Sequence, residues 1–304
     1  MFRNSLKTLV LTFLVLSASA VTCQIKLPAE KDDQIIIPLD LSSQRPVLEL
    51  YIGTNGPYRF IFDTGSGGSL IDTELANDLH LDVVGEDTLY TPGSDRMRTS
   101  RQVRVPMINF PKATTFENVI MNTVDIRKML PVDGIISTSF FEEYLLTINY
   151  PQSNLILTVG ELDSTEKDVI HYMPKQRIIN LTITVDGHPV EAHLDSGSPG
   201  RFGIPYALKN KLNFISEPKE TGVIHTPVAS FKRWRAILKG TIRVGNVVFE
   251  NPEVNLVENF EFVNLGYQFS KDLTITIDTK NKLIKFEKKV SRHAENGNEE
   301  NNRE

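Results

Sequence analysis

The chain has 304 residues, of which 40% are hydrophobic and 23% are charged, and this composition is typical of a globular protein. The 33 basic and 38 acidic residues give a formal net charge of -5, which argues against a broad basic surface for nucleic acid. We therefore predict one large domain or two lobes with a sizeable core, and no nucleic-acid partner.

The first twenty residues have the features of a secretory signal. Arg3 and Lys7 precede an apolar run from Leu9 to Leu16, and Ala18-Ser19-Ala20 has the small residues of a signal-peptidase site. We predict that residues 1–20 are a signal peptide and that the protein is exported to a periplasmic or extracellular compartment. No later segment has the roughly eighteen uninterrupted apolar residues of a membrane span, so we expect no integral membrane span.

The only cysteine, Cys23, follows this signal, so no intramolecular disulfide can form. Its position also permits a lipid anchor, but Ala20-Val21-Thr22 matches a lipoprotein cleavage box poorly, and we favour cleavage after Ala20. Residues 21–33 are then an N-terminal tether or a short pro-segment. Residues 291–304 are predicted to be a disordered tail, because they have too few apolar residues to offset the entropy of ordering.

A segment of the first half of the chain is repeated in the second half. Residues 47–66 and residues 179–198 both read as a strand, a turn, a strand and then Asp-Thr-Gly-Ser or Asp-Ser-Gly-Ser. Asn55-Gly56 and Asp186-Gly187 are strong hairpin signals, and the flanking residues alternate between apolar and polar. Each copy is therefore predicted to open with a β-hairpin that ends at its Asp.

Matching elements follow in each copy. A helical stretch is predicted after Asp72 in the first copy and after Pro205 in the second. One strand is predicted over residues 145–157 and another over residues 274–286, so that Thr147 and Thr276 are equivalent residues of the repeat.

This duplication predicts the architecture of the protein. Two similar β-rich halves give an all-β fold of two duplicated β-barrel-like lobes. The N-terminal lobe is expected over residues 34–165 and the C-terminal lobe over residues 166–290, with a junction where charge and Pro174 interrupt the β pattern.

Each copy places an acid at the end of an apolar strand. Asp63 follows Phe60-Ile61-Phe62, Asp195 follows Ala192-His193-Leu194, and both are followed by a small hydroxyl residue and a Gly. A buried acid costs free energy unless it is hydrogen-bonded, and the Gly lets backbone amides approach the carboxylate. If the copies pack about a pseudo-twofold axis, the two carboxyl groups meet and one of them keeps a proton. Such a pair can activate a water molecule and polarise a substrate carbonyl.

Four short motifs carry a family resemblance. Asp63-Thr64-Gly65-Ser66 and Asp195-Ser196-Gly197-Ser198, followed downstream by Ile135-Ile136-Ser137 and Asn264-Leu265-Gly266, resemble the paired signatures of pepsin-like and retropepsin-like aspartic proteases. The resemblance covers about residues 34–288 and is greatest to the compact, exported, retropepsin-like kind with both halves in one chain.

The resemblance implies a bilobal pepsin-like or retropepsin-like acid protease fold with a cleft between the lobes. It implies that Asp63 and Asp195 are the catalytic pair that activates water, and that Thr64 and Ser196 cross-brace their loops by hydrogen bonds. Gly65 and Gly197 belong to the same turns. In the family pattern, Ser66 and Ser198 support the outer carboxylate oxygens.

Two features depart from the family's pattern. Family members carry a Gly-rich flap, whereas residues 90–98 and 225–229 stand in its place and do not resemble one. Ser137 stands where the downstream apolar element normally ends in Gly. These departures leave the lid and the substrate-binding residues unassigned.

The resemblance predicts an aspartic endopeptidase that acts on peptides or proteins and needs no cofactor. The alternative is a non-catalytic binding or inhibitor module that holds a peptide or glycan in the cleft. We expect a monomer, because both halves are present in one chain.

The histidines and one basic-aromatic cluster are two further groups of candidate functional residues. The six histidines lack metal-ligand spacing, so no metal is predicted. His193 shares a strand face with Asp195, which permits a hydrogen bond, although a structural role is the simpler interpretation. Lys232-Arg233-Trp234-Arg235 is either a surface for an acidic or extended substrate or a solvated hairpin with a packed Trp, and we favour the hairpin.

Overall fold

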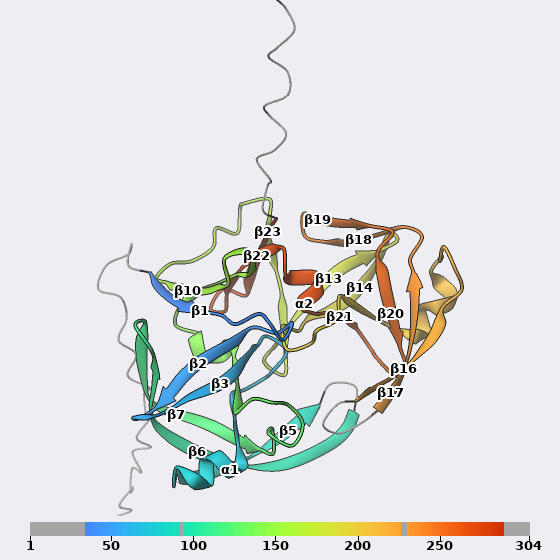
Figure 1. Cartoon of the computed structure of the whole chain (residues 1–304). Coiled ribbons are helices and arrows are strands. Elements are labelled where there is room, and N and C mark those ends of the chain that lie inside the picture. The colour runs from blue at the N-terminus through green and yellow to red at the C-terminus, as the bar shows by residue number, and fades with distance from the viewer. Residues whose placement is uncertain (1–33, 92–93, 226–229, 289–304) are drawn as a thin grey trace, which may run out of the picture.

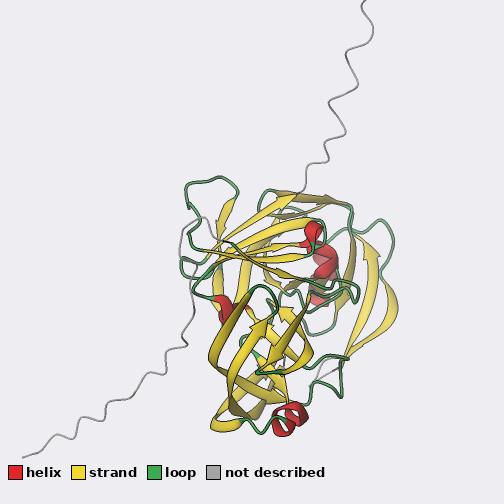
Figure 2. Ribbon diagram, turned by 60° about the vertical axis from the view of Figure 1, so that its left-hand side comes forward, coloured by secondary structure: helices red, strands yellow, loops and turns green. Residues whose placement is uncertain are grey.

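The computed structural model describes residues 34–91, 94–225 and 230–288. Strands make up most of this part of the chain and are arranged in two lobes, as predicted for an all-β bilobal fold (Figures 1 and 2). The predicted signal peptide, the tether over residues 21–33 and the tail over residues 291–304 lie outside the described residues.

The first lobe is built on a sheet that closes on itself. Its strands are β2 (Val47–Ile52), β3 (Asn55–Asp63), β4 (Leu70–Asp72), β5 (Asp82–Thr91), β6 (Ser94–Phe110), β7 (Thr114–Val124) and β8 (Gly134–Ser137). They pair in the order β2-β3-β8-β4-β7-β6-β5, and an additional pairing of β2 with β6 closes six of them into a barrel. Aromatic rings packed edge-to-face or tilted fill this lobe, from Phe62, Phe110, Phe116, Phe140 and Phe141.

The second lobe is built on an open sheet of ten strands. The strands are β12 (Met173–Lys175), β13 (Ile178–Val185), β14 (His188–Leu194), β15 (Phe202–Pro205), β16 (Lys219–His225), β17 (Ser230–Ile237), β18 (Thr241–Val244), β19 (Val247–Glu250), β20 (Glu253–Val257) and β21 (Val263–Leu265). They pair in the order β16-β17-β20-β15-β21-β14-β13-β18-β19, with β12 beside β13. The second lobe is thus an opened version of the first.

A third sheet joins the two lobes. Its strands are β1 (Ile35–Pro38), β9 (Leu145–Asn149), β10 (Asn154–Thr158), β11 (Val169–His171), β22 (Leu273–Asp278) and β23 (Leu283–Lys288), in the order β1-β10-β9-β22-β23-β11. At its centre Thr147 of β9 lies opposite Thr276 of β22, and their hydroxyl oxygens are 3.0 Å apart. Because these two threonines are equivalent residues of the repeat, their pairing marks the pseudo-twofold axis between the lobes.

Three local predictions were wrong in detail. Residues 145–157 and residues 274–286 are not single strands but antiparallel hairpins, β9–β10 and β22–β23. The first hairpin of the repeat turns at Gly53 and Thr54, two residues before the predicted Asn55-Gly56, because Gly53 supplies the positive φ of 60° that the turn needs. The matching turn at Asp186-Gly187 lies where it was predicted.

Helices in the described part of the chain are few and short. They are α1 (Thr73–Asp78), α2 (Tyr267–Ser270) and three 3-10 turns over Thr138–Phe141, Tyr150–Gln152 and Tyr206–Lys211. The helix predicted after Asp72 is confirmed as α1. The stretch after Pro205 is a 3-10 turn instead of an α-helix, and the side chain of Pro205 makes no cap hydrogen bond to it. The difference follows from the start residue, because proline has no side-chain acceptor for the first amides.

Asp72 anchors α1 to the lobe beneath it. Its Oδ1 accepts hydrogen bonds from the amides of Glu74 (3.0 Å) and Leu75 (3.3 Å), and its Oδ2 accepts one from the amide of Arg127 (2.9 Å). Replacing buried Asp72 with Ala is expected to lower the free energy of unfolding by about 2 to 4 kcal/mol, measured by urea denaturation. Asp78→Ala, at the exposed far end of the helix, is the matched control and should change stability little; equal losses would contradict the capping role.

Candidate active site

The two lobes place their acids at equivalent strand ends. Asp63 is the last residue of β3, which pairs in parallel with β8, and Asp195 directly follows β14, which pairs in parallel with β21. Each acid therefore leaves its strand beside a second strand that comes from a distant part of the same lobe.

Four buried hydrogen bonds join the two loops that follow these acids. The amide of Thr64 donates to Ser196 Oγ, and the amide of Ser196 donates to Thr64 Oγ1, both at 3.0 Å. Thr64 Oγ1 donates to the carbonyl of Leu194 (2.8 Å), and Ser196 Oγ donates to the carbonyl of Phe62 (2.7 Å). Since neither Thr64 nor Ser196 is exposed to solvent, this reciprocal set holds the loops in one geometry.

Two glycines let each carboxyl group approach the opposite loop. Asp63 Oδ1 accepts hydrogen bonds from the amide of Gly65 (2.8 Å) and, across the lobe boundary, from that of Gly197 (3.3 Å). A Cβ atom on Gly197 would lie 2.5 Å from Asp63 Oδ2, and one on Gly65 would lie 2.9 Å from Asp195 Cγ. The structure therefore brings the carboxyl groups of Asp63 and Asp195 together, and any side chain at either glycine would collide with them.

The acid of the first lobe holds a proton near neutral pH. Burial, and then the charge of neighbouring Asp195, raise the pKa of Asp63 to about 7, against a weaker opposing effect of its two amide hydrogen bonds. Asp63 is therefore protonated at a pH where an isolated Asp is ionised.

The acid of the second lobe has a partner that sequence reasoning missed. The side-chain amide of Asn264 donates to Asp195 Oδ2 at 2.6 Å, and the amide of Ser198 donates to Asp195 Oδ1 at 3.0 Å. Asn264 belongs to β21, where it lies opposite His193 of β14. The sequence placed Asn264 in the downstream motif, but only this parallel pairing brings its amide to the acid.

The predicted support of the carboxylates by two serine hydroxyls is wrong for Ser66. Its Oγ donates to the carbonyl of Gly68 at 2.7 Å, within its own loop, so its proton is not available to Asp63. At Ser198 the backbone amide makes the contact with Asp195. Backbone amides thus make the hydrogen bonds to the carboxylates that the resemblance assigned to the serine hydroxyl groups.

Ser137, the departure from the usual Gly, is accommodated by other hydroxyl groups. Ser137 is fully buried, its amide donates to Ser69 Oγ (3.1 Å), and its Oγ is 2.8 Å from Ser139 Oγ. The equivalent residue in the second lobe is Gly266, where a Cβ atom would collide with the carbonyl oxygen of Gly200. The first lobe therefore has room for a side chain that the second lobe excludes.

Long hairpins form the two segments that stand in place of the family's Gly-rich flap. β5 pairs with β6 as far as Thr91 and Ser94, and β16 pairs with β17 as far as His225 and Ser230 (Figure 1). Residues 92–93 and 226–229, at the tips, lie outside the described residues. The described parts of these hairpins are built by cross-strand pairing of polar and β-branched residues, so the sequence has no Gly-rich pattern there.

His193 is buried beside the acid pair. It is 4% exposed, its ring stacks on Phe262 with centroids 5.2 Å apart, and its Nε2 has no hydrogen-bond partner among the described residues. A Cβ atom on Gly65 would lie 2.8 Å from this nitrogen and 2.9 Å from Asp195 Oδ1. Burial lowers the pKa of His193, although the charge of Asp195 acts in the opposite direction, so the ring is neutral at neutral pH.

The basic-aromatic cluster of β17 is engaged within the second lobe. Trp234 packs against Tyr206 with ring centroids 4.1 Å apart, Arg233 Nε donates to Thr221 Oγ1 (3.2 Å), and Arg235 pairs with Glu253 (3.5 Å). This arrangement agrees with a hairpin that is solvated on one face and packed on the other.

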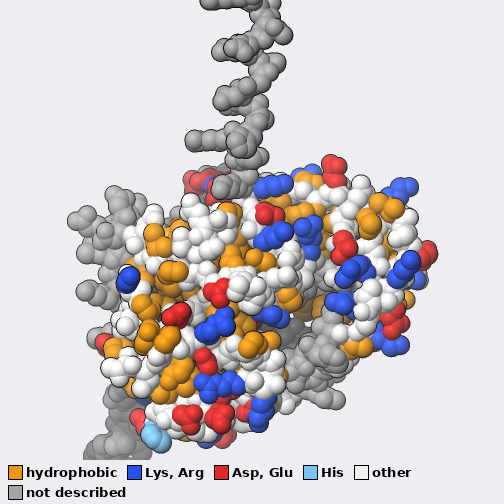
Figure 3. All heavy atoms as spheres, viewed as in Figure 1, with side chains coloured by type: hydrophobic (Ala, Val, Ile, Leu, Met, Phe, Trp, Pro, Cys, Tyr) orange, Lys and Arg blue, Asp and Glu red, His pale blue; other side chains and the backbone are white. Residues whose placement is uncertain are grey.

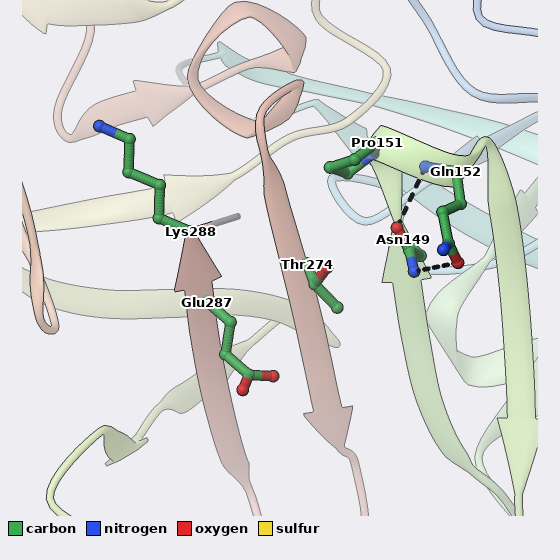
Figure 4. A pocket seen from close by; sticks show the side chains of 6 residues that line it. All are labelled: Asn149, Pro151, Gln152, Thr274, Glu287 and Lys288. Atoms are coloured by element: carbon green, nitrogen blue, oxygen red, sulfur yellow. Dashed lines mark hydrogen bonds between the residues drawn. The ribbon is translucent and has the colours of Figure 1, made fainter. Parts of the chain in front are cut away.

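Other surfaces of the described residues offer less chemistry. The pocket drawn in Figure 4 has a volume of about 250 Å³ and is lined by none of the residues predicted for the site. The side chain of Asn149 in this pocket is hydrogen-bonded to Gln152. Within the described ranges no three His, Cys, Asp or Glu side chains converge as metal ligands, and no helix there is long and apolar enough to cross a membrane. On the face shown in Figure 3 basic and acidic side chains are interspersed.

These features define a bilobal β protein with one pair of acids between two equivalent lobes. The model of the Aspartyl protease family matches residues 48–140 and residues 181–269, one match in each half of the chain and each including its Asp-Thr/Ser-Gly motif. The chain therefore belongs to the aspartyl protease family, and the retropepsin-like resemblance is confirmed. A search of curated proteins found no match.

Proposed function

We propose that the protein is an aspartic endopeptidase that hydrolyses peptide bonds with a water molecule activated by Asp63 and Asp195. The observation that carries this proposal is the shared site of the two acids, with Asp63 holding a proton at a pH where an isolated Asp is ionised. Membership of the aspartyl protease family supports peptides or proteins as substrates.

The arrangement assigns one role to each acid. Ionised Asp195 takes a proton from the water, whose oxygen forms a bond to the substrate carbonyl carbon, while the proton of Asp63 hydrogen-bonds the carbonyl oxygen. Collapse of the resulting tetrahedral intermediate breaks the C–N bond, and a proton from the pair leaves with the amine. The reaction therefore needs a pair that holds one proton, with donors already aimed at the developing charge.

The pH dependence follows from the raised pKa of Asp63. Because activity needs the proton that Asp63 loses as the pH rises through about 7, kcat/KM is expected to fall about tenfold per pH unit above that point. The measurement is cleavage of a fluorogenic peptide, chosen from a library digest, between about pH 4 and about pH 9. A rate that keeps rising up to the alkaline end would contradict the one-proton mechanism.

The same digest decides between an enzyme and a binder. Cleavage that a statine-type inhibitor suppresses supports the endopeptidase. Peptides that bind the protein, remain intact and are displaced by the inhibitor would overturn it in favour of the non-catalytic module.

We propose further that the protein works after export, since residues 1–20 have the pattern of a signal peptide. N-terminal sequencing of the mature protein is expected to begin at Val21. A mature chain that begins at Met1 would contradict export by this signal.

A further inference from the structure

The two acids of the site receive different hydrogen bonds. Asp63 accepts both of its amide hydrogen bonds on Oδ1. Within the described residues, no amide donates to its Oδ2, and Asp195 is the only side chain that hydrogen-bonds Asp63. Asp195 accepts one hydrogen bond on each oxygen, and the one from Asn264 Nδ2 to Oδ2 is the shorter at 2.6 Å. Asp63 thus has an oxygen free to carry a proton, whereas both oxygens of Asp195 already face donors.

The difference arises at one position of the repeat. In the first lobe Ile135 of β8 lies opposite Ile61 of β3, two residues before Asp63. In the second lobe Asn264 of β21 lies opposite His193 of β14, two residues before Asp195. The lobes therefore present an apolar side chain and a hydrogen-bond donor, respectively, at equivalent places beside their acids.

Three further titratable or charged groups face the acids or their loops. Arg45 Nε donates to the carbonyl of Gly197 at 2.7 Å. Burial raises the pKa of Tyr150 and lowers that of His193, so both side chains are neutral at neutral pH. None of these groups donates a hydrogen bond to Asp195 in the described structure. The hydrogen bonds that distinguish the two acids are therefore those from Asn264 and from the backbone amides.

We infer that Asn264 is a positioning residue that keeps the negative charge on Asp195 and the shared proton on Asp63. This inference rests on the proposed function and deepens it, because it decides which acid is the base. A hydrogen bond to a carboxylate is stronger than one to a neutral carboxyl group, and a proton on Asp195 Oδ2 would weaken the contact with the amide. Ile135 offers Asp63 no such donor, so the proton rests there.

The experiment that tests this inference locates the proton by NMR of the full-length protein with ¹³Cγ-labelled aspartate. The signals are assigned with Asp63→Asn and Asp195→Asn. At about pH 6 the wild-type Asp63 signal is expected at a protonated shift and the Asp195 signal at an ionised shift. In Asn264→Leu the two shifts should move toward each other, because the proton is then shared more evenly.

Two further variants keep this test decisive. Asn264→Ala removes the donor with a smaller side chain, and it should move the shifts in the same direction if the Leu variant does not fold. Ile135→Leu, at the equivalent place of the first lobe, is the matched control and should leave both shifts unchanged. Wild-type shifts in a folded Asn264→Leu or Asn264→Ala protein would overturn the inference.

Activity distinguishes failure of the inference from failure of the proposed function. Asn264→Leu is expected to lower kcat at least about tenfold with little change in KM, and to alter the pH profile. A wild-type protein that has the asymmetric shifts but cleaves no peptide refutes the endopeptidase and leaves the proton assignment standing. If the wild-type protein cleaves peptides but Asn264→Leu has unaltered shifts, the role of Asn264 is refuted and the endopeptidase stands. This holds even if kcat of Asn264→Leu falls.

Discussion

Asp63→Asn is expected to lower kcat/KM for peptide cleavage by at least about a thousandfold. The asparagine amide keeps the size of the side chain and can still donate a hydrogen bond. It has no acidic proton that it can transfer, so the pair loses the acid that serves the substrate carbonyl oxygen and the leaving amine. The same peptide, assayed at the pH of maximal wild-type activity, gives the comparison.

Two controls separate lost chemistry from lost structure. Asp163→Asn, in an exposed turn between β10 and β11, makes the same substitution away from the acid pair and should keep wild-type activity. The second control is stability. An Asp whose folded pKa of about 7 exceeds its unfolded value of 3.8 binds more protons when folded, so its contribution to stability is lost as the pH rises between these values.

It follows that Asp63→Asn should melt at a higher temperature than the wild type above pH 7, with a smaller difference near pH 4. A variant that is both more stable at alkaline pH and inactive has lost the reaction and not the fold. Unchanged turnover in Asp63→Asn would eliminate the acid pair as the catalytic centre.

The parts of the fold that the sequence predicts are those that depend on neighbours in the chain. Duplication of a strand, a turn and an Asp-Thr/Ser-Gly motif is visible directly, and it predicts two β lobes. Asp72 also reveals α1, because an N-cap acts on amides only two or three residues away. The offset that relates Thr147 to Thr276 correctly predicts two residues that meet between the lobes.

Some local errors had a signal that could have corrected them. Pro151 lies inside the strand predicted over residues 145–157, and proline rarely occurs within a central strand. The chain instead makes a 3-10 turn there, and Ser153 adopts a left-handed conformation with φ of 54° before β10 begins. At the first hairpin, two glycines three residues apart competed for the turn, and the strand register selected Gly53.

The site itself depends on contacts that no local pattern specifies. Asn264 reaches Asp195 because β21 pairs in parallel with β14, and the register of two strands far apart in the chain is decided by the packing of the whole lobe. Ser66 illustrates the converse, since its hydroxyl found an acceptor within its own loop. The motif thus predicted which acids meet, whereas their hydrogen-bond partners had to be observed.

Thr64→Val is expected to lower the free energy of unfolding by about 2 to 5 kcal/mol and to reduce kcat strongly. Valine fills the same space, but it leaves the amide of Ser196 and the carbonyl of Leu194 without partners in a fully buried place. The loops then lose the contacts that hold the two acids in register. Urea denaturation and peptide cleavage measure the two effects.

Ser196→Ala should behave similarly, because it removes the reciprocal pair of hydrogen bonds, and the double variant should lose less than the sum of the two. Thr276→Val is the matched control: it removes a buried hydroxyl contact between the same lobes, to Thr147, at a distance from the acid loops. It should cost about 1 kcal/mol and leave kcat unchanged. If Thr64→Val had no greater effect on kcat than Thr276→Val, the loops would be held by the surrounding sheets and not by the four hydrogen bonds between them.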